Sequence, residues 1–392
     1  MRNVIIQGAV RTPIGDIGGS LARVSAVNLG IAAAAESLRR AGVPADKVDE
    51  TIFGNVLQAG QGMNPARQIG MGVGVPPAVT AFTVNMVCGS GMKAIDLAWQ
   101  RILLGRAEVV LAGGAESMSQ APYLLPAMRE GARLGNSAAL DSVVSDGLTD
   151  IFGQIHMGVT AENIAREFAI TREAQDRFAL ESQQKYGAAA KAGRFAEEIV
   201  PVKIKERKNE VIVGADEHPR PETTFEKLSS LRPAFQANGT VTAGNASGIN
   251  DGAAAVVLMA EDSPLAGNKA ASVRIRDIAA TGCAPATMGM GPVGAVRLLL
   301  KNNGMSMGDI GLWELNEAFA AQSLAVIHEL GMDPGRVNVN GGAIALGHPI
   351  GASGARIVVT LIRQMKRQSV ALGVASLCIG GGMGIAMLLE NR

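Results

Sequence analysis

The sequence has few cysteines, histidines and aromatic residues, no excess of basic side chains and no long apolar run. Of its 392 residues only three are cysteines, four are histidines and 3% are aromatic. An odd number of cysteines without paired spacing argues against a disulfide framework and indicates a reducing compartment. Basic and acidic side chains nearly balance, 36 against 35, which argues against nucleic acid or a membrane surface as a partner. No apolar run approaches the roughly 18 residues that a membrane span requires.

Glycine, in contrast, is abundant, and strand and helix patterns alternate. The 49 glycines exceed the usual share of about 7%, and with few aromatic rings the interior must be packed from aliphatic side chains and alanine. Alternating patterns run to about residue 119 and resume at 253, which predicts an α/β fold. The part between holds loops, charged helices and a predicted hairpin, with strands at 200–204 and 211–213 and a turn at Lys208-Asn209.

A cysteine stands where a strand pattern becomes a helix pattern. The alternating run 81–87 precedes Cys88, and apolar residues recur at helical spacing from Met92 onwards. Because the amino end of a helix favours an anion, we expect the pKa of the Cys88 thiol to lie below its model value of about 8.5. Glycines on both sides of Ser90 mark a place where the backbone approaches another group closely. The alternative is a buried, inert cysteine.

Two further residues supply acid–base candidates. His348 precedes Pro349 in a glycine-rich stretch that cannot be a continuous helix, so we expect a loop to present it as a base. Cys378 ends an apolar strand pattern, where open α/β sheets place ligands. The backbone N–H groups around the following Gly380 suit an oxyanion. A buried strand cysteine is the alternative for Cys378.

A fourth candidate and a faint repeat complete the pattern. Asn316 ends a short apolar run at the predicted start of a helix, where it is either a functional amide or simply the N-cap. The segment 88–95 has a counterpart in 350–357, and 109–114 in 377–382. Two similar halves would bring the ends of their sheets to one pocket.

With these motifs in order, the chain resembles the thiolases, acyl-CoA:acetyl-CoA C-acyltransferases. The resemblance rests on Arg11-Thr12-Pro13, 113–119, 316–319 and the segments around the two cysteines and the histidine. It implies a layered α/β/α/β/α sandwich of two similar halves with an inserted loop domain. The implied boundaries are 1–119 plus 250–270 for the N-terminal half, 120–249 for the loop domain that covers coenzyme A, and 271–392 for the C-terminal half.

The resemblance also implies a mechanism. The cysteine at Cys88 takes the acyl group from a thioester while His348 receives its proton, and Cys378 then exchanges a proton with the α-carbon of a second acetyl-CoA. One oxyanion pocket is implied at His348 and a water on Asn316, and the other at the backbone N–H groups of Cys88 and Gly380. No metal and no redox cofactor are implied.

Further residues of this sequence match positions that line the family's channel for coenzyme A and the acyl group. They are Leu148, His156, Met157, Arg220, Leu231, Phe235, Ala243, Ser247, Gly248, Met288, Ala318 and Phe319. Arg220 stands between two prolines and has a solvated turn as its alternative, and His156 a surface loop. The His-Met pair before Gly158 resembles the short-chain type, which forms acetoacetyl-CoA from acetyl-CoA.

Several alternatives remain open at this point. A degradative 3-ketoacyl-CoA thiolase would accept longer chains, and a non-catalytic acyl-CoA- or lipid-binding relative would be expected to lose one of the two cysteines. Thiolate and imidazole also suit zinc, so a metal site is a further alternative. The resemblance also implies a homodimer or homotetramer. A strand pattern at 3–6 in place of a signal peptide and the lack of a peroxisomal address predict a cytoplasmic protein.

Overall fold

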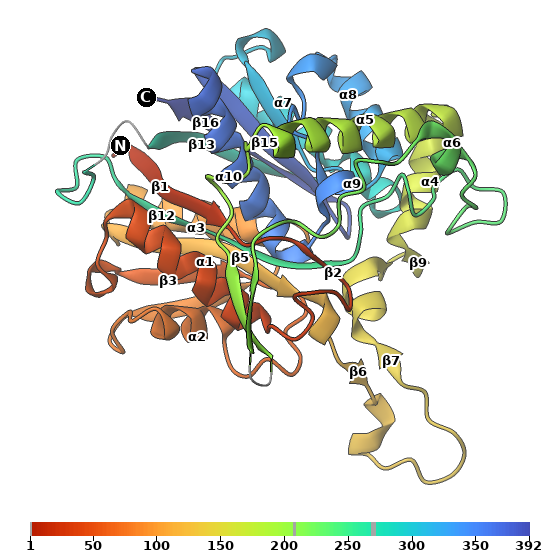
Figure 1. Ribbon diagram of the computed structural model, residues 1–392, viewed down its shortest axis with the longest axis horizontal. Helices are drawn as coiled ribbons and strands as arrows, with labels where there is room; N and C mark the ends of the chain where they lie inside the picture. Colours follow the sequence, from red (N-terminus) through yellow and green to blue (C-terminus); the bar gives the residue numbers. More distant parts are fainter. Residues whose placement is uncertain (1, 207–208, 268–271) are drawn as a thin grey trace.

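Strands and helices alternate in layers in the computed structural model of the chain, which describes residues 2–206, 209–267 and 272–392 (Figure 1). The strands of the main sheet are β1 (Val4–Arg11), β2 (Gly15–Asp16), β3 (Glu50–Gly54), β4 (Thr80–Val84), β5 (Val109–Ser117), β12 (Asn250–Ala260), β13 (Val273–Gly282), β14 (Leu312–Leu315), β15 (Leu372–Ile379) and β16 (Met383–Asn391). They follow the order β14-β15-β16-β13-β1-β12-β5-β3-β4, with β2 beside β12.

The main sheet has two halves that meet at β1 and β13. These two strands pair antiparallel, with Val4 opposite Ile275 and Ile6 opposite Val273. The half-sheets are therefore hydrogen-bonded into one continuous sheet. β12 is buried along its whole length because it lies between β1 and β5 and is covered by helices on both faces. The predicted layered α/β fold is confirmed, and the structure adds this hydrogen-bonded junction.

Helices form the outer layers and the layer between the two halves. They are α1 (Ala26–Ala41), α2 (Pro65–Gly72), α3 (Ser90–Leu103), α4 (Met157–Glu167), α5 (Arg172–Lys191), α6 (Phe225–Ser229), α7 (Gly291–Asn302), α8 (Ala320–Leu330), α9 (Ala343–Leu346) and α10 (Ile350–Gln368). α1 and α2 pack on the first half, and α7 and α8 on the second. α3 and α10 contact each other, and α3 packs on strands of the first half while α10 packs on strands of both halves, so they form the central layer.

The two central helices cross closely, and glycines make that possible. A Cβ atom on Gly91 of α3 would lie 2.7 Å from the backbone nitrogen of Ala355 in α10, and one on Gly354 would lie 2.5 Å from the backbone nitrogen of Met92. Only glycine leaves room for this approach. The crossing lies in the first turns of both helices, so it brings the residues just before them, Cys88 and His348, to the same region.

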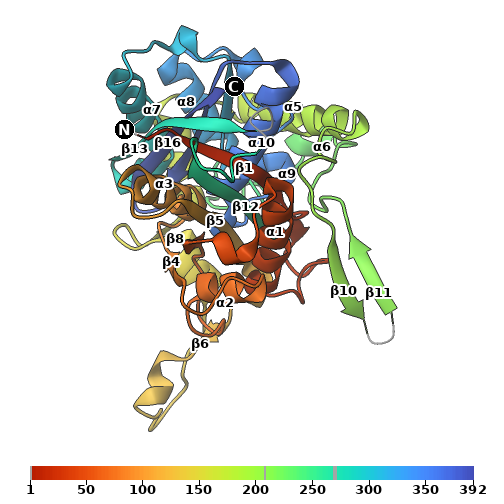
Figure 2. The ribbon, with the colours of Figure 1, turned by 90° about the vertical axis from the view of Figure 1, so that its left-hand side faces the viewer.

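The segment between β5 and β12 contributes smaller elements around this region. Its strands are β6 (Tyr123–Leu124), β7 (Leu140–Asp141), β8 (Thr149–Asp150), β9 (Ile155–His156), β10 (Val202–Glu206) and β11 (Asn209–Val213). β6 and β7 belong to an arm that projects from the body, and β10 and β11 form a second protruding hairpin (Figure 2). The predicted hairpin is confirmed, but Lys208 of its predicted turn lies outside the described residues, and Asn209 begins β11. Within the described ranges no helix is long and apolar enough to cross a membrane.

Candidate active site

A cavity of about 410 Å³ lies where the two halves meet the inserted segment. Cys88 comes from the first half, His348 from the second, and Ser247 from the inserted segment. Other predicted site residues that line it are Leu148, His156, Met157, Phe235, Ala243, Gly248, Met288, Ala318 and Phe319. Most of this lining is apolar, as expected for a pocket that takes an acyl group and excludes water.

Cys88 sits on a tight turn between β4 and α3. The strand ends at Val84 and the helix begins at Ser90. The Ser90 hydroxyl donates to the carbonyl of Val87 at 2.6 Å and accepts from the backbone N–H of Met86 at 2.9 Å. Val87 has a φ of 44°, which is uncommon for a β-branched residue and marks local strain just before the cysteine. The predicted junction of strand and helix is confirmed.

The predicted acidity of the Cys88 thiol is wrong. Burial, aided by the nearby Glu116 carboxylate, raises the pKa of Cys88 to about 11. Hydrogen bonds from the backbone N–H groups of Gly380 and of Cys88 itself oppose this shift but do not cancel it. Loss of water around a developing thiolate outweighs the helix end here. The thiol is therefore protonated at neutral pH, and its attack requires a base.

His348 is placed to be that base. Its Nδ1 atom lies 2.6 Å from the Ser353 hydroxyl, which donates its own proton to the carbonyl of Pro349 at 2.9 Å. The hydroxyl must then accept from His348, so we assign the proton to Nδ1. Nε2 carries the lone pair and has no hydrogen-bond partner within the described part of the chain. Burial, aided by the positive Arg356, lowers the pKa of His348 to about 3, so the imidazole is neutral.

Cys378 lies beside the same site, behind residues that line the cavity. It lies near the end of β15 and is fully buried, in one apolar cluster with Met157, Met288 and Phe319. Burial raises the pKa of Cys378 well above its usual value, and the neighbouring Cys88 sulfur adds to that shift. The Gly380 N–H bonded to the Cys88 sulfur follows Cys378 by two residues. The two thiols thus belong to one site, although Cys378 is not among the cavity-lining residues.

The N-cap interpretation of Asn316 is wrong. α8 begins only at Ala320. The chain before it runs extended beside Ser247, whose backbone N–H donates to the carbonyl of Ala318 at 3.0 Å. This pairing between distant segments holds 316–319 out of the helix. It also places Ser247 and Ala318 side by side on the cavity wall.

The Asn316 side chain is fully buried. Its backbone N–H donates to the carbonyl of Ser376 at 3.0 Å, but neither Oδ1 nor Nδ2 has a partner among residues 2–206, 209–267 and 272–392. A buried amide left unpaired is costly, so such a group is retained where it serves another purpose. Holding a water for catalysis is a purpose of that kind.

His156 and Phe235 form an aromatic wall of the cavity. His156 is the N-cap of α4, and its Nδ1 accepts the backbone N–H of Gly158 at 3.0 Å. The ring stacks on Phe235 with centroids 4.8 Å apart. Phe235 meets Phe319 edge-on. The surface-loop alternative for His156 is therefore excluded by its packing.

Two predicted coenzyme A contacts lie outside the cavity. The Arg220 side chain is 61% exposed and donates to Asp16 and to three backbone carbonyls of its own turn. This conformation corresponds to the solvated turn that was the alternative for Arg220. Leu231 is 38% exposed and closely approaches Gly244. The structure does not bring either residue to the cavity.

Sequence reasoning missed His218, Ser353 and Asn250. His218 lines the cavity, Ser353 orients His348, and the Asn250 side chain accepts the backbone N–H of His348 at 2.9 Å. One signal was available for His218, since histidine is rare in this chain. The other two act through contacts between segments far apart in the sequence or across a helix turn, which no spacing pattern reveals.

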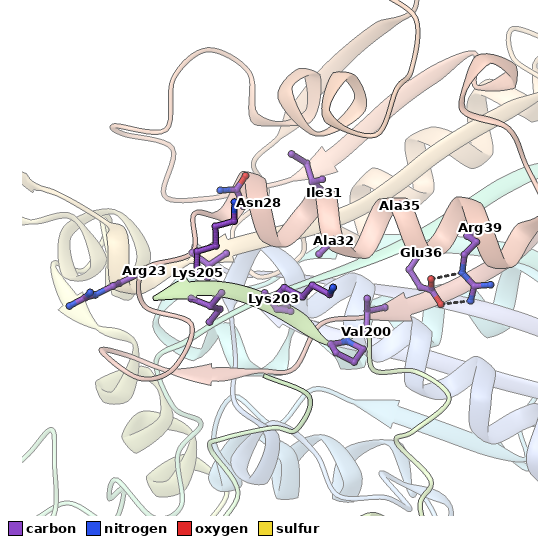
Figure 3. Close-up of a pocket in the computed structure, with 14 residues that line it drawn as sticks. Arg23, Asn28, Ile31, Ala32, Ala35, Glu36, Arg39, Val200, Lys203 and Lys205 are labelled. Carbon is purple, nitrogen blue, oxygen red and sulfur yellow. Dashed lines mark hydrogen bonds and ion pairs between the residues drawn. The ribbon is translucent and has the colours of Figure 1, made fainter. Parts of the chain in front are cut away.

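A larger hollow, of about 590 Å³, lies between α1 and β10 (Figure 3). Its rim carries Arg23, Lys203 and Lys205, and an ion pair joins Glu36 to Arg39. Among the described residues that line it there is no cysteine, no histidine and no predicted site residue. The chemistry therefore belongs to the smaller cavity. Within the described part of the chain no three His, Cys, Asp or Glu side chains are grouped to hold a metal ion.

Comparison with known proteins agrees with this geometry. The family model described as "Thiolase, N-terminal domain" matches residues 4–262, and "Thiolase, C-terminal domain" matches 269–391. The chain belongs to the thiolase family. This thiolase is 54% identical to an acetyl-CoA acetyltransferase of Escherichia coli and 52% identical to one of Cupriavidus necator, in each case over 100% of both chains.

Solved structures of two kinds resemble this thiolase. The Bacillus anthracis acetyl-CoA acetyltransferase has a TM-score of 0.97 at 46% identity, and the human mitochondrial 3-ketoacyl-CoA thiolase 0.95 at 44%. Both comparisons cover 100% of this chain and 99% of the other. The shared fold therefore does not by itself separate the two activities, and the residues around the acyl group must do so.

Proposed function

We propose that this thiolase is an acetyl-CoA acetyltransferase, which condenses two molecules of acetyl-CoA to acetoacetyl-CoA and free coenzyme A and also catalyses the reverse thiolysis. The observation that carries the proposal is that Cys88 and His348 line one cavity, with the Nε2 lone pair of His348 unpartnered among the described residues, while Cys378 interacts with the Cys88 sulfur from just outside it. The names of the full-length relatives support the same substrate class.

In the first half-reaction, Cys88 loses its proton to Nε2 of His348 as its sulfur attacks the carbonyl carbon of acetyl-CoA. The carbonyl oxygen becomes an oxyanion beside the backbone N–H groups of Cys88 and Gly380, which already bond the resting sulfur. The carbon–sulfur bond to coenzyme A then breaks. The departing thiolate takes the proton from His348, and an acetyl group remains on Cys88.

In the second half-reaction, Cys378 passes its thiol proton to Nε2 of His348, and the resulting thiolate takes an α-proton from a second acetyl-CoA. The resulting enolate oxygen is stabilised by His348 and by a water held on Asn316. Its α-carbon attacks the acetyl carbon on Cys88, which forms the new carbon–carbon bond and releases the Cys88 sulfur. The released Cys88 thiolate takes the proton back from Nε2 of His348, and Cys378 keeps the α-proton, so both buried thiols end protonated. Neither half-reaction requires a metal or a redox cofactor.

The packing around Cys378 supports short acyl groups. Met157, Met288 and Phe319 close the cavity around this sulfur with little exposed surface. A long chain needs a path past them. A degradative 3-ketoacyl-CoA thiolase would use the same catalytic groups, so chain length is the property that separates the two activities.

The arm that carries β6 and β7 supports a homodimer or homotetramer. It exposes five large apolar side chains, namely Tyr123, Leu125, Met128, Leu134 and Leu140. Leu134 is 99% exposed. Apolar side chains gathered on a projecting arm are typical of an interface with another chain. We place the protein in the cytoplasm because its cysteines are free.

Mass spectrometry after addition of acetyl-CoA tests the proposal. The wild type and Cys378→Ser should each gain one acetyl group, on Cys88, whereas Cys88→Ser should gain none. Of these three proteins, only the wild type should then form acetoacetyl-CoA at full rate. Cys283→Ser is the matched control, because that half-buried cysteine does not line the cavity and the variant should retain both steps. An acetylated Cys88→Ser protein, or a wild type that cannot cleave acetoacetyl-CoA, would contradict the proposal.

A further inference from the structure

A histidine without an assigned role stands in the wall of the cavity. His218 follows β11 in the inserted segment and lines the same cavity as Cys88 and His348. Its Nδ1 lies 2.5 Å from Oδ1 of Asp16, a residue of the short strand β2. A carboxylate only accepts, so Nδ1 carries a proton and donates it. Nε2, on the other side of the ring, is the atom left for a ligand.

The His218 ring is fixed beside the serine that the family resemblance assigns to coenzyme A. A Cβ atom on Gly248 would lie 2.4 Å from Cε1 and 2.8 Å from Nε2 of His218. Only glycine at this position lets the ring lie against the backbone. Gly248 follows Ser247, and both line the cavity. Nε2 and the Ser247 side chain therefore belong to the same stretch of wall.

The Asp16 carboxylate that bonds the ring is itself held by several partners. Its Oδ1 also accepts from Nδ2 of Asn250 at 3.2 Å, and its Oδ2 accepts from Arg220 at 3.0 Å. Asn250 in turn accepts the backbone N–H of His348 at 2.9 Å. One carboxylate thus connects the orientation of His218 to the loop of the catalytic base. A ring held this firmly loses little entropy when it binds a ligand.

We propose that His218 is a further substrate-binding residue, whose Nε2 hydrogen-bonds an amide of the pantetheine arm of the CoA thioester beside Ser247. The inference rests on the proposed function. A neutral amide fits this place better than a phosphate, because the ring is bonded to the carboxylate of Asp16, whose backbone N–H donates to a second carboxylate, that of Glu217. Arg220, the cation nearest in sequence, is turned towards Asp16 and its own backbone.

Calorimetric binding of coenzyme A and of pantetheine tests the assignment without catalysis. Loss of one neutral hydrogen bond weakens binding by about 3- to 10-fold. His218→Phe should show this loss equally for both ligands, and His218→Gln should recover part of it. Gly248→Ala, which displaces the ring, should give a similar loss. His328→Gln is the matched control, because His328 is 83% exposed on α8. The thermal midpoint of each variant checks that it is folded.

The outcomes separate this inference from the proposed function. Unchanged affinity of His218→Phe for both ligands overturns the role of His218. Weaker binding of coenzyme A alone also overturns it, because the contact is then to the nucleotide. In either case cleavage of acetoacetyl-CoA by the wild type leaves the proposed function standing. Equal losses for coenzyme A and pantetheine, with partial recovery in His218→Gln, support the assignment.

Discussion

Nδ1 of His348 lies 2.6 Å from the hydroxyl of Ser353, one turn into α10. The hydroxyl proton is bound to the carbonyl of Pro349, so Ser353 accepts from the ring and leaves Nε2 as a base facing the cavity. The histidine therefore owes its reactive tautomer to the helix that it precedes.

Ser353→Ala should lower kcat while leaving the fold intact. Without the hydroxyl, Nδ1 has no fixed acceptor, and the ring is free to change tautomer and orientation. A lost hydrogen bond at a buried group of this kind predicts a decrease of roughly 10-fold or more. Ser229→Ala is a matched control, since that hydroxyl also donates to a carbonyl one turn earlier but lies exposed in α6. Steady-state kinetics measures the effect, and equal kcat values for the two variants would refute it.

His348 should make stability depend on pH below neutrality. Its pKa is about 3 in the folded protein and about 6.5 in the unfolded chain, so below pH 6.5 the unfolded chain binds a proton that the folded one does not. The stabilisation is complete above pH 6.5 and is lost as the pH falls towards 3. Across this window the free energy of unfolding should fall more steeply with decreasing pH in the wild type than in His348→Asn. The difference between the two slopes should be up to about 1.4 kcal/mol per pH unit. Denaturant unfolding at pH 6.5 and 5 measures both slopes, and equal slopes would contradict the assignment.

Asn316→Leu should separate stability from activity. Leucine removes a buried amide whose two polar atoms have no partner among the described residues, so the free energy of unfolding should stay the same or rise. Loss of an oxyanion contact should lower kcat by on the order of 100-fold. Urea unfolding and the condensation assay report the two quantities.

Asn338→Leu is the control for this pair of measurements. Asn338 is equally buried, but its amide donates to Leu315 at 2.7 Å and to Glu317 at 2.8 Å. Its replacement should destabilise the protein by about 1–3 kcal/mol. A similar loss of stability in Asn316→Leu would show that the Asn316 amide is structural.

Met288→Ala should extend the range of acyl chains. Met288 is 3% exposed and packs with Met157, Phe319 and Cys378, so its removal opens space beside the second thiol. Each additional methylene that becomes buried contributes about 0.8 kcal/mol. The ratio of kcat/KM for longer 3-ketoacyl-CoA substrates to that for acetoacetyl-CoA should therefore rise. Met118→Ala, at a lining position in a different cluster, should change this ratio less. A wild type that already prefers long chains would exclude the short-chain assignment.

Local pattern was enough to place the catalytic candidates on their elements. Cys88 lies at the junction of a strand and a helix, His348 in a loop before a helix, and Cys378 at a strand end, as expected. Period and glycine content report backbone conformation over a few residues, and these three positions depend on little else. The domain boundaries and the roles of these residues remain predictions.

Contacts between distant segments decided the rest. The pKa of Cys88 depends on burial and on Glu116, and the extended chain after Asn316 depends on its pairing with Ser247. Arg220 turns to Asp16 rather than to the cavity. By itself the sequence determined which side chains carry the chemistry and on which kind of element each stands. Only the tertiary structure decided their protonation and their neighbours, because desolvation and hydrogen bonding act between residues that the chain order keeps apart.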